Sequence, residues 1–168
     1  MSGHPALRTA VLVLSDKGAR GEREDLSGPA LAAWLADRGA AVIHREILPD
    51  EIDLMVDRLT AWADSGDFDL ILTCGGTGVS PRDVTPEATR RILRTEIPGF
   101  GELMRATSLA KSPHAIVSRA LAGIRARCLI VNLPGSPRAA VENLEAVWSA
   151  VPHTVAKLQG DDADCVGP

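Results

Sequence analysis

The chain has 168 residues, the usual size of one domain, and folding such a chain should bury roughly 70% of its extended surface. A net charge of −4 and only 3% aromatic residues argue against a general nucleic-acid binder, which usually presents a basic face and stacking aromatics. No apolar stretch approaches the ~18 residues that cross a bilayer, and the three scattered cysteines lack zinc or disulfide spacing, so we expect a cytoplasmic protein with no membrane association.

Four apolar runs of strand length alternate with longer stretches of helical character. They are Val11–Leu14, Ala41–Leu48, Leu70–Cys74 and Leu129–Leu133. This alternation is typical of a parallel sheet flanked by helices. We therefore predict a three-layer α/β fold, with a mostly parallel sheet and helices on both faces, in a single domain over residues 9–160. The ends, residues 1–8 and 161–168, are expected to be flexible.

The first two connections between strands are predicted to be helices. Apolar residues recur at helical spacing from Leu26 to Leu35 and again from Ile52 to Trp62. Gly39 and Gly66 follow these runs, where a helix should stop. Trp34 and Trp62 belong to the apolar stripes, so both are expected to be core residues rather than stacking partners for a cofactor.

Two further helices have recognisable starts. Thr85 is predicted to cap one helix, with Pro86 at its first position, and Ser136-Pro137 is predicted to begin the last helix. Between them, the polar stretch over residues 98–125 gives no firm secondary structure, although Leu103, Met104 and Leu109 suggest a helix. A ligand site is therefore sought first at the better-defined strand ends.

Ligands of open parallel sheets bind beyond the carboxyl ends of the strands. The polar and glycine residues found at these positions are Ser15-Asp16, Pro49-Asp50, Gly75-Gly76-Thr77-Gly78 and Pro134-Gly135-Ser136. Glycines leave backbone amides accessible to a phosphate, and a loop that enters a helix N-terminus is itself an anion site. A tight turn is the alternative explanation for the Gly75–Gly78 segment alone. Two such loops at one sheet edge favour a phosphorylated small molecule.

Two other phosphate-binding motifs are excluded. The segment GGTGVSPRD lacks the Gly-Lys-Ser/Thr of a P-loop and the spacing of a dinucleotide fingerprint. Cys74 beside the loop could be a nucleophile, but no histidine lies nearby in sequence, which favours a small buried thiol. The chemistry is therefore assigned to carboxylates.

Asp50 and Asp83 follow neighbouring strands and are predicted to face the same crevice. Near phosphates, such a pair suggests Mg²⁺, which takes one or two carboxylates and completes its shell with water and phosphate oxygens. A helix cap is the alternative role for Asp50. Asp83 has no such alternative if Thr85 fills the capping position.

The segment GGTGVSPRDVTPEAT, Gly75–Thr89, resembles the molybdopterin adenylyltransferase family, the MogA and MoaB group that includes the gephyrin G domain. Four further blocks resemble the same family, with SRALAGIR and LPGSP in the expected order. They are SDKGARGEREDLSGPAL from Ser15 to Leu31, PGFGELMRATS, SRALAGIR and LPGSPRAAVENL. The resemblance spans about Thr9 to Gly160, so it implies the family fold for almost the whole chain.

The resemblance implies Mg²⁺-dependent adenylylation of molybdopterin by ATP, with release of pyrophosphate. By matching positions, Asp50 and Asp83 resemble the catalytic, metal-holding carboxylates, and Ser118 resembles a serine that contacts the pterin, with a turn residue as its alternative. Gly75, Gly76, Thr77 and Gly78, together with Pro134, Gly135 and Ser136, resemble the loops around the ligand phosphates.

The resemblance also bears on partners. It implies a homotrimer and a downstream metal-insertion protein that receives the product. A non-catalytic molybdopterin carrier of the MoaB type is the alternative on the same scaffold, and retention of both carboxylates argues against it. An assembly module like gephyrin would need further domains.

Overall fold

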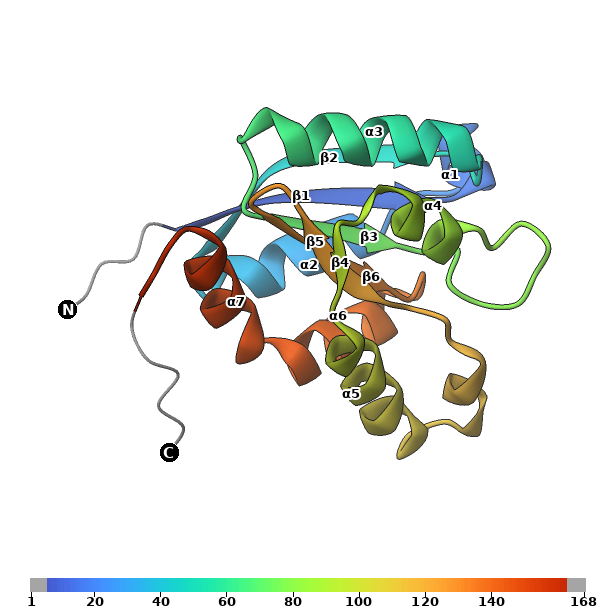
Figure 1. Ribbon diagram of the computed structural model, residues 1–168. Coiled ribbons are helices and arrows are strands. Elements are labelled where there is room, and N and C mark those ends of the chain that lie inside the picture. The colour runs from blue at the N-terminus through green and yellow to red at the C-terminus, as the bar shows by residue number, and fades with distance from the viewer. Residues whose placement is uncertain (1–5, 163–168) are drawn as a thin grey trace.

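The computed structural model describes residues 6–162, which form a six-stranded sheet between two layers of helices (Figure 1). The strand order is β2-β1-β3-β6-β5-β4. Four neighbouring strands are parallel, namely β1 (Leu7–Leu14), β2 (Ala40–Leu48), β3 (Leu70–Cys74) and β6 (Cys128–Leu133). β5 (Ala122–Arg125) runs antiparallel to both β6 and the short edge strand β4 (Thr95–Glu96). The predicted α/β class is confirmed.

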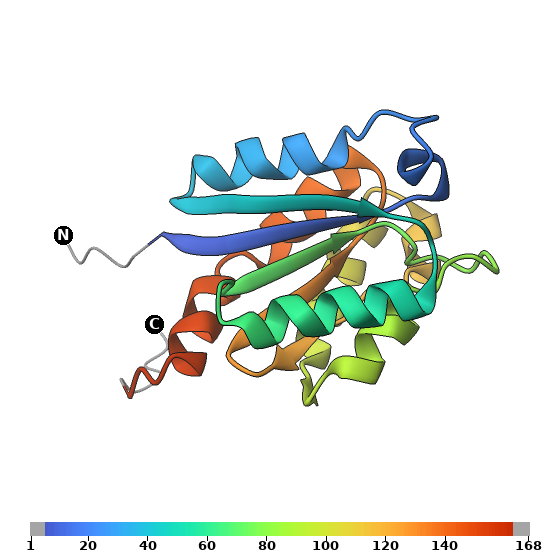
Figure 2. The same cartoon turned by 90° about the horizontal axis from the view of Figure 1, so that it is seen from above.

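The helices divide between the two faces of the sheet (Figure 2). One face carries α3 (Ile52–Ser65) and α4 (Thr85–Ile92). The other face carries α2 (Ser27–Ala36), α5 (Pro98–Leu109), α6 (Pro137–Val147) and α7 (Ala150–Leu158). Two short elements lie outside these layers, the one-turn helix α1 (Asp16–Ala19) and the 3-10 helix η1 (Pro113–Val117).

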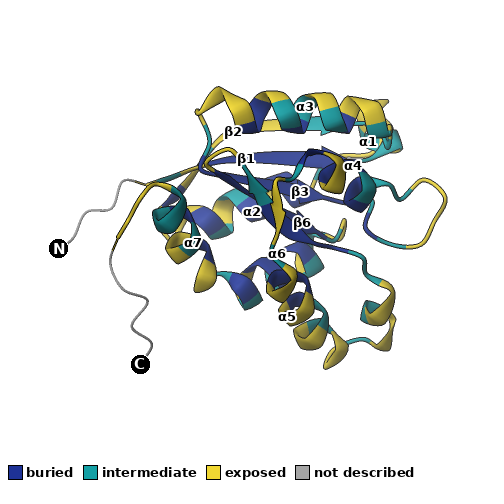
Figure 3. Cartoon of the chain, in the orientation of Figure 1, coloured by how far each residue is buried: buried dark blue, intermediate teal, exposed yellow. Residues whose placement is uncertain are grey.

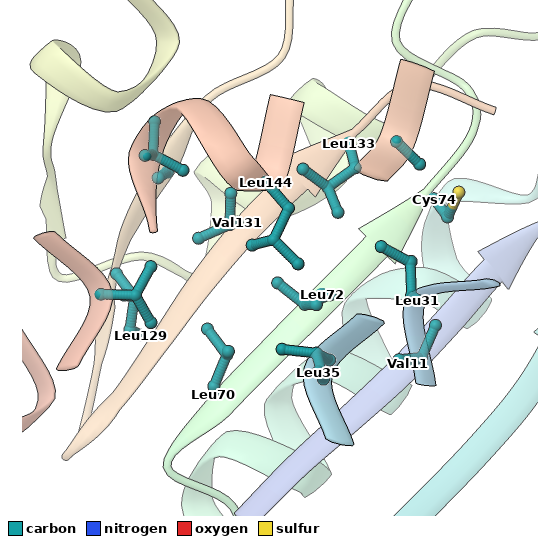
Figure 4. Packing of buried hydrophobic residues seen from close by; sticks show 14 of the residues in the cluster. Val11, Leu31, Leu35, Leu70, Leu72, Cys74, Leu129, Val131, Leu133 and Leu144 are labelled. Atoms are coloured by element: carbon teal, nitrogen blue, oxygen red, sulfur yellow. The ribbon is translucent and has the colours of Figure 1, made fainter. Parts of the chain in front are cut away.

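The central strands are buried on both sides, which explains their continuous apolar runs (Figure 3). Alternate residues point to opposite layers, so Leu72 and Val131 belong to one core and their neighbours Ile71 and Ile130 to the other. Figure 4 shows the first core, where α2 and α6 pack their leucines against the sheet. Trp62 is only 7% exposed and Trp34 is partly buried in the other core, so both tryptophans are core residues as predicted.

The predicted helix stops are found at positive φ. Gly66 ends α3 in the left-handed conformation at φ +77°, and Gly39 lies beyond α2 at φ +72°. The helix suggested within residues 98–125 is α5, whereas β4, β5 and η1 were not predicted. These elements are only two to five residues long, too short for a periodic pattern.

One predicted cap is wrong. Thr85 does not cap α4 but is its first residue, preceded by Val84 at the capping position. The Thr85 side chain is fully buried, and its Oγ1 donates a hydrogen bond of 2.9 Å to the carbonyl of Gly75. The hydroxyl therefore serves the glycine loop, whose carbonyl would otherwise be buried without a partner.

Asp69 joins both ends of the described chain at the amino ends of the strands. Its carboxylate accepts hydrogen bonds from the backbone and guanidinium of Arg8, and from Nε2 of Gln159 at 2.8 Å. β1 begins at Leu7, two residues before the predicted domain boundary, and residues 1–5 and 163–168 lie outside the described structure. Within residues 6–162, no helix is long and apolar enough to span a membrane.

Candidate active site

A crevice of about 650 Å³ opens at the carboxyl ends of the four parallel strands. We call it the crevice throughout. Residues from every one of those strand ends line it, among them Ser15, Asp50, Gly75, Gly76, Asp83, Gly135 and Ser136. The structure thus brings together both predicted carboxylates and parts of both predicted phosphate loops, as expected for an open parallel sheet.

At Gly75 and Gly76, the start of the loop after β3, both a positive φ and nearby atoms exclude a side chain. Gly75 lies at φ +110°, and a Cβ there would come within 2.5 Å of the Leu14 carbonyl oxygen. Gly76 lies at φ +64°, and a Cβ there would collide with Oγ1 of Thr85 and lie 3.3 Å from Oδ1 of Asp50. A Cβ on Gly135 of the second loop would lie 3.3 Å from the Cα of Gly75, a tight but less severe contact. Side chains are excluded from this wall of the crevice, which leaves the backbone exposed to a ligand.

A buried polar network supports this loop from below. Asn132 on β6 donates from Nδ2 to the hydroxyls of Thr73 at 2.9 Å and Thr89 at 3.0 Å. Thr89 in turn donates to the carbonyl of Thr85, whose hydroxyl holds Gly75. Our sequence reasoning missed this network, and the signal for it is an asparagine within an otherwise apolar buried strand.

Asp50 and Asp16 exchange hydrogen bonds across the ends of β1 and β2. The amide of Asp16 donates to Oδ2 of Asp50 at 3.1 Å, and the amide of Asp50 donates to Oδ1 of Asp16 at 3.0 Å. Arg82 binds both oxygens of Asp16 and also Oε1 of Glu51. Asp50 is therefore no helix cap, since Glu51 precedes α3 and the Asp50 carboxylate binds a different strand end.

The electrostatics of the crevice favour a cation. Burial raises the pKa of Asp50 above its ordinary value, and the negative charges of Asp16 and Asp83 act in the same direction. The hydrogen bond from the Asp16 amide and the positive charge of Arg82 act against this increase in the pKa. Each of the two predicted carboxylates uses one oxygen within the protein, because Oδ2 of Asp83 accepts from the amide of Ser80 at 2.9 Å. Among the described residues, neither Oδ1 has a hydrogen-bond donor, so each is available to a ligand.

The donor set at the crevice fits Mg²⁺ bound together with a phosphate, and it does not fit a metal held by protein alone. Within residues 6–162, no three His, Cys, Asp or Glu side chains are grouped as a complete metal site. Two carboxylates are what Mg²⁺ commonly takes from a protein when water and substrate phosphates supply the remaining ligands. Asp50 and Asp83 would be the two protein ligands.

Arg119 fixes the loop that carries Asp83. Its guanidinium donates to the carbonyls of Gly78 at 2.7 Å and Asp83 at 2.6 Å, and it pairs with the carboxylate of Glu87. Its backbone amide donates to the carbonyl of Thr77 at 2.8 Å. Our sequence reasoning did not select this residue, because its partners lie more than 30 positions away.

A second cavity of about 310 Å³ lies beside the same loop, between α5, η1 and the start of α6. We call it the helical pocket. Ser118, the residue that follows η1 as its C-cap, lines it together with Thr77, Gly78 and Pro134. The predicted site residues are thus divided between two cavities, because the loop after β3 turns from one to the other between Gly76 and Thr77. The Ser118 hydroxyl also accepts a long bond of 3.4 Å from the Ala120 amide, so it has a turn role as well.

Cys74 is a buried thiol, as predicted. It is 1% exposed, and its Sγ donates to the carbonyl of Pro134 at 2.9 Å. Burial raises the pKa of Cys74 to about 12, so the thiolate is essentially absent at neutral pH. The crevice offers no protein nucleophile from this residue.

Comparison with known proteins gives one consistent result. A model described as a probable molybdopterin binding domain matches residues 10–153. The molybdopterin adenylyltransferase of Helicobacter pylori is 45% identical over 157 residues, covering 92% of this chain and 89% of the relative. The molybdenum cofactor synthesis protein cinnamon of Drosophila melanogaster is 40% identical over 93% of this chain but only 26% of its own length. The crystal structure of the molybdopterin biosynthesis enzyme MoaB from Thermus thermophilus superposes with a TM-score of 0.87 at 49% identity, covering 92% of this chain and 98% of that one.

Proposed function

The chain belongs to the molybdopterin-binding family and is an adenylyltransferase of molybdenum cofactor biosynthesis; from that premise we propose that it transfers AMP from ATP to the terminal phosphate of molybdopterin in a Mg²⁺-dependent reaction. The observation that carries the proposal is the pair Asp50 and Asp83. Each presents an unbonded carboxylate oxygen in a crevice that Gly75, Gly76 and Gly135 also line and where these glycines expose the backbone.

We assign the nucleotide to the crevice. Gly75 and Gly76 leave the backbone open to the phosphates. Ser136 caps α6, so phosphates beside it would lie at the N-terminus of that helix, where the helix dipole favours negative charge. The crevice volume of about 650 Å³ is within the usual range of roughly 300–1,000 Å³ for small-molecule sites. We assign the pterin to the helical pocket, where Ser118 lies.

The reaction needs no nucleophile from the protein. An oxygen of the molybdopterin phosphate attacks the α-phosphorus of ATP, the bond from that phosphorus to the β-phosphate oxygen breaks, and pyrophosphate leaves with the electron pair. When bound, Mg²⁺ would neutralise the negative charge that the phosphates accumulate. The protein positions the phosphate of molybdopterin and the α-phosphate of ATP on either side of the loop after β3. Arg119 binds the carbonyl of Asp83, and the amide of Asp16 binds the carboxylate of Asp50, so both carboxylates are fixed in place.

Direct synthesis tests the proposal. The protein is mixed with molybdopterin, ATP and Mg²⁺, and adenylylated pterin and pyrophosphate are measured by chromatography. Product formation that requires all three components is expected, whereas EDTA should abolish it. Tight molybdopterin binding without product, under conditions where a known adenylyltransferase turns over, would instead support the carrier of the MoaB type.

We also propose a cytoplasmic homotrimer that hands its product to a metal-insertion protein, on the basis of the family resemblance. The assembly has a simple test, because each chain has a mass of 17.7 kDa. Light scattering after gel filtration should give about three times that mass. A monomer at micromolar concentration would contradict the proposed assembly without affecting the proposed reaction.

A further inference from the structure

We propose that Glu142 and Lys111 recognise the aminopyrimidine edge of the pterin in the helical pocket. This inference rests on the proposed function, since it takes molybdopterin as the ligand of that pocket. It names the two side chains that would distinguish a 2-amino-4-oxopyrimidine ring from other flat heterocycles.

The walls of the helical pocket suit a flat ring. Ala115, Val117, Pro134 and Ala139 contribute apolar surface, and the volume of about 310 Å³ is at the small end for ligand sites. In such pockets apolar walls supply most of the contact, while a few polar groups fix orientation and specificity. The question is which polar groups of this pocket are free to do so.

Two polar residues of the helical pocket already use their donors in hydrogen bonds within the protein. Asn143 uses both protons of its side-chain amide, on the hydroxyl of Ser108 and the carbonyl of Ala139. Arg105 donates to the carbonyl of Ala120 at 2.8 Å and so holds the segment that follows Ser118. These contacts connect α5 with α6 and with the segment that precedes β5, which makes both residues parts of the pocket frame.

Glu142 has a different arrangement. Its Oε1 accepts a hydrogen bond from Nε of Arg138 at 2.9 Å and forms an ion pair with Nζ of Lys111 at 3.1 Å. No donor among the described residues binds its Oε2. The hydrogen bonds from Arg138 and then Lys111 keep the pKa of Glu142 below its ordinary value, so the carboxylate is ionised. It is also the only carboxylate among the described residues that line the pocket.

The pair matches the hydrogen-bonding pattern of a pterin. Its pyrimidine edge presents two neighbouring donors, the 2-amino group and N3–H, followed by one acceptor, the 4-oxo oxygen. With Oε1 already held by Arg138 and Lys111, the free Oε2 of Glu142 can accept from both neighbouring donors in charge-assisted bonds, and the ammonium beside it can donate to the oxo group. A 2,4-diamino ring carries a donor where the oxo group stands and lacks the proton on N3. In the same orientation it would offer Glu142 only the 2-amino donor and would offer Lys111 no acceptor.

A purely structural ion pair is the competing explanation. Lys111, Arg138 and Glu142 could merely connect the end of α5 with the surface of α6, as exposed pairs often do with little effect on stability. Such a triad would influence the melting temperature but would not alter the preference between two ligands of the same shape. Ligand preference is therefore the measurement that separates the two roles.

The test is a set of equilibrium titrations with molybdopterin, each followed by competition with pterin and with 2,4-diaminopteridine. For the unmodified protein, pterin should compete at least tenfold better than the diamino compound. Glu142→Gln should weaken molybdopterin binding about tenfold or more, because the uncharged amide cannot accept from both ring donors. Lys111→Met should reduce mainly the preference between the two competitors.

Matched controls make each outcome decisive. Arg138→Gln removes a partner of the same carboxylate oxygen, yet residue 138 does not line the pocket and its side chain is 85% exposed. That variant should bind molybdopterin within about twofold of the unmodified protein. An unmodified protein that binds no molybdopterin would defeat the proposed function itself. Normal binding together with unchanged affinity and preference in Glu142→Gln would overturn this inference alone.

Discussion

The crevice and the helical pocket share one loop but are built from different parts of the chain. The crevice lies where four parallel strands end, and the glycine loops there expose backbone among side chains that include Glu24, Asp25, Asp50 and Asp83. The helical pocket lies among α5, η1 and α6, and side chains line most of it. A site made of backbone depends on a few glycines and on strand register, whereas a site made of side chains can change its ligand by substitution. We therefore expect variants of the crevice to alter the chemistry and variants of the pocket to alter recognition.

The largest effect is expected from Asp83→Asn. The substitution preserves size but removes the charge that Mg²⁺ requires, so adenylylation should fall by about 100-fold or more. The hydrogen bond from Ser80 to the side chain can persist, because an amide oxygen also accepts. The melting temperature should thus stay near that of the unmodified protein, and Asp50→Asn should behave in the same way. Full activity in either variant would remove that residue from the mechanism.

Substitution of two glycines tests whether contact with neighbouring atoms, in addition to the positive φ, excludes a side chain from the loop after β3. Gly76→Ala introduces both an unfavourable φ of +64° and a collision with Thr85, and should cost about 2–4 kcal/mol of unfolding free energy. Gly39→Ala has a similar φ of +72° but meets nothing within 4 Å, so about 1 kcal/mol is expected. Chemical denaturation of both variants measures the difference. Equal costs would show that strain at φ alone restricts the loop.

Arg119→Lys should separate positioning from binding. Lysine lacks the planar fork that reaches the carbonyls of Gly78 and Asp83 together, so the loop would lose part of its support. We expect kcat to fall about tenfold while the KM for molybdopterin changes little. Arg125→Lys is the control, since Arg125 binds Asp64 and the carbonyl of Ile92 in a similar network that lines neither cavity. A matching loss of kcat in both variants would indicate a general effect on the fold.

The smallest effect is expected from Ser118→Ala in the helical pocket. A hydroxyl bonded to a neutral ligand group contributes roughly 0.5 to 1.5 kcal/mol, so molybdopterin should bind about threefold to tenfold more weakly. Affinity for ATP should hardly change, as measured by titration of each ligand separately. Normal pterin affinity with impaired ATP binding would mean that the ligands occupy the two cavities in the opposite order.

The crevice could be predicted from the sequence because its parts are local. An apolar strand followed by glycines or by aspartate can be recognised from a segment of about ten residues. Parallel pairing of the strands then brings such segments to one edge of the sheet. Thr85 was misassigned for the converse reason. Its hydroxyl has the local pattern of a cap, but the carbonyl of Gly75, ten positions earlier, is the partner that the folded chain provides.

The helical pocket was largely invisible in the sequence. Residues 98–125 contain one helix followed by short elements, and Ser118 was selected only through the family resemblance. The polar residues that face the pocket come from segments about 30 positions apart, such as Lys111 and Glu142. Arg119 is similar, because its role depends on carbonyl groups that every residue possesses. Such contacts leave no distinguishing residue type at a fixed spacing.

The hydrogen bonds of Asp69 to residues near both ends of the described chain bear on how this domain can be combined with others. Arg8 and Gln159 meet on one carboxylate at the amino ends of the strands, at the edge opposite both cavities. The described part of the chain therefore begins and ends at the edge opposite both openings (Figure 1). In cinnamon the matching region is 26% of the length, so most of that chain lies outside it. Attachment points on this edge suit modular fusion, in which a second domain is tethered close by.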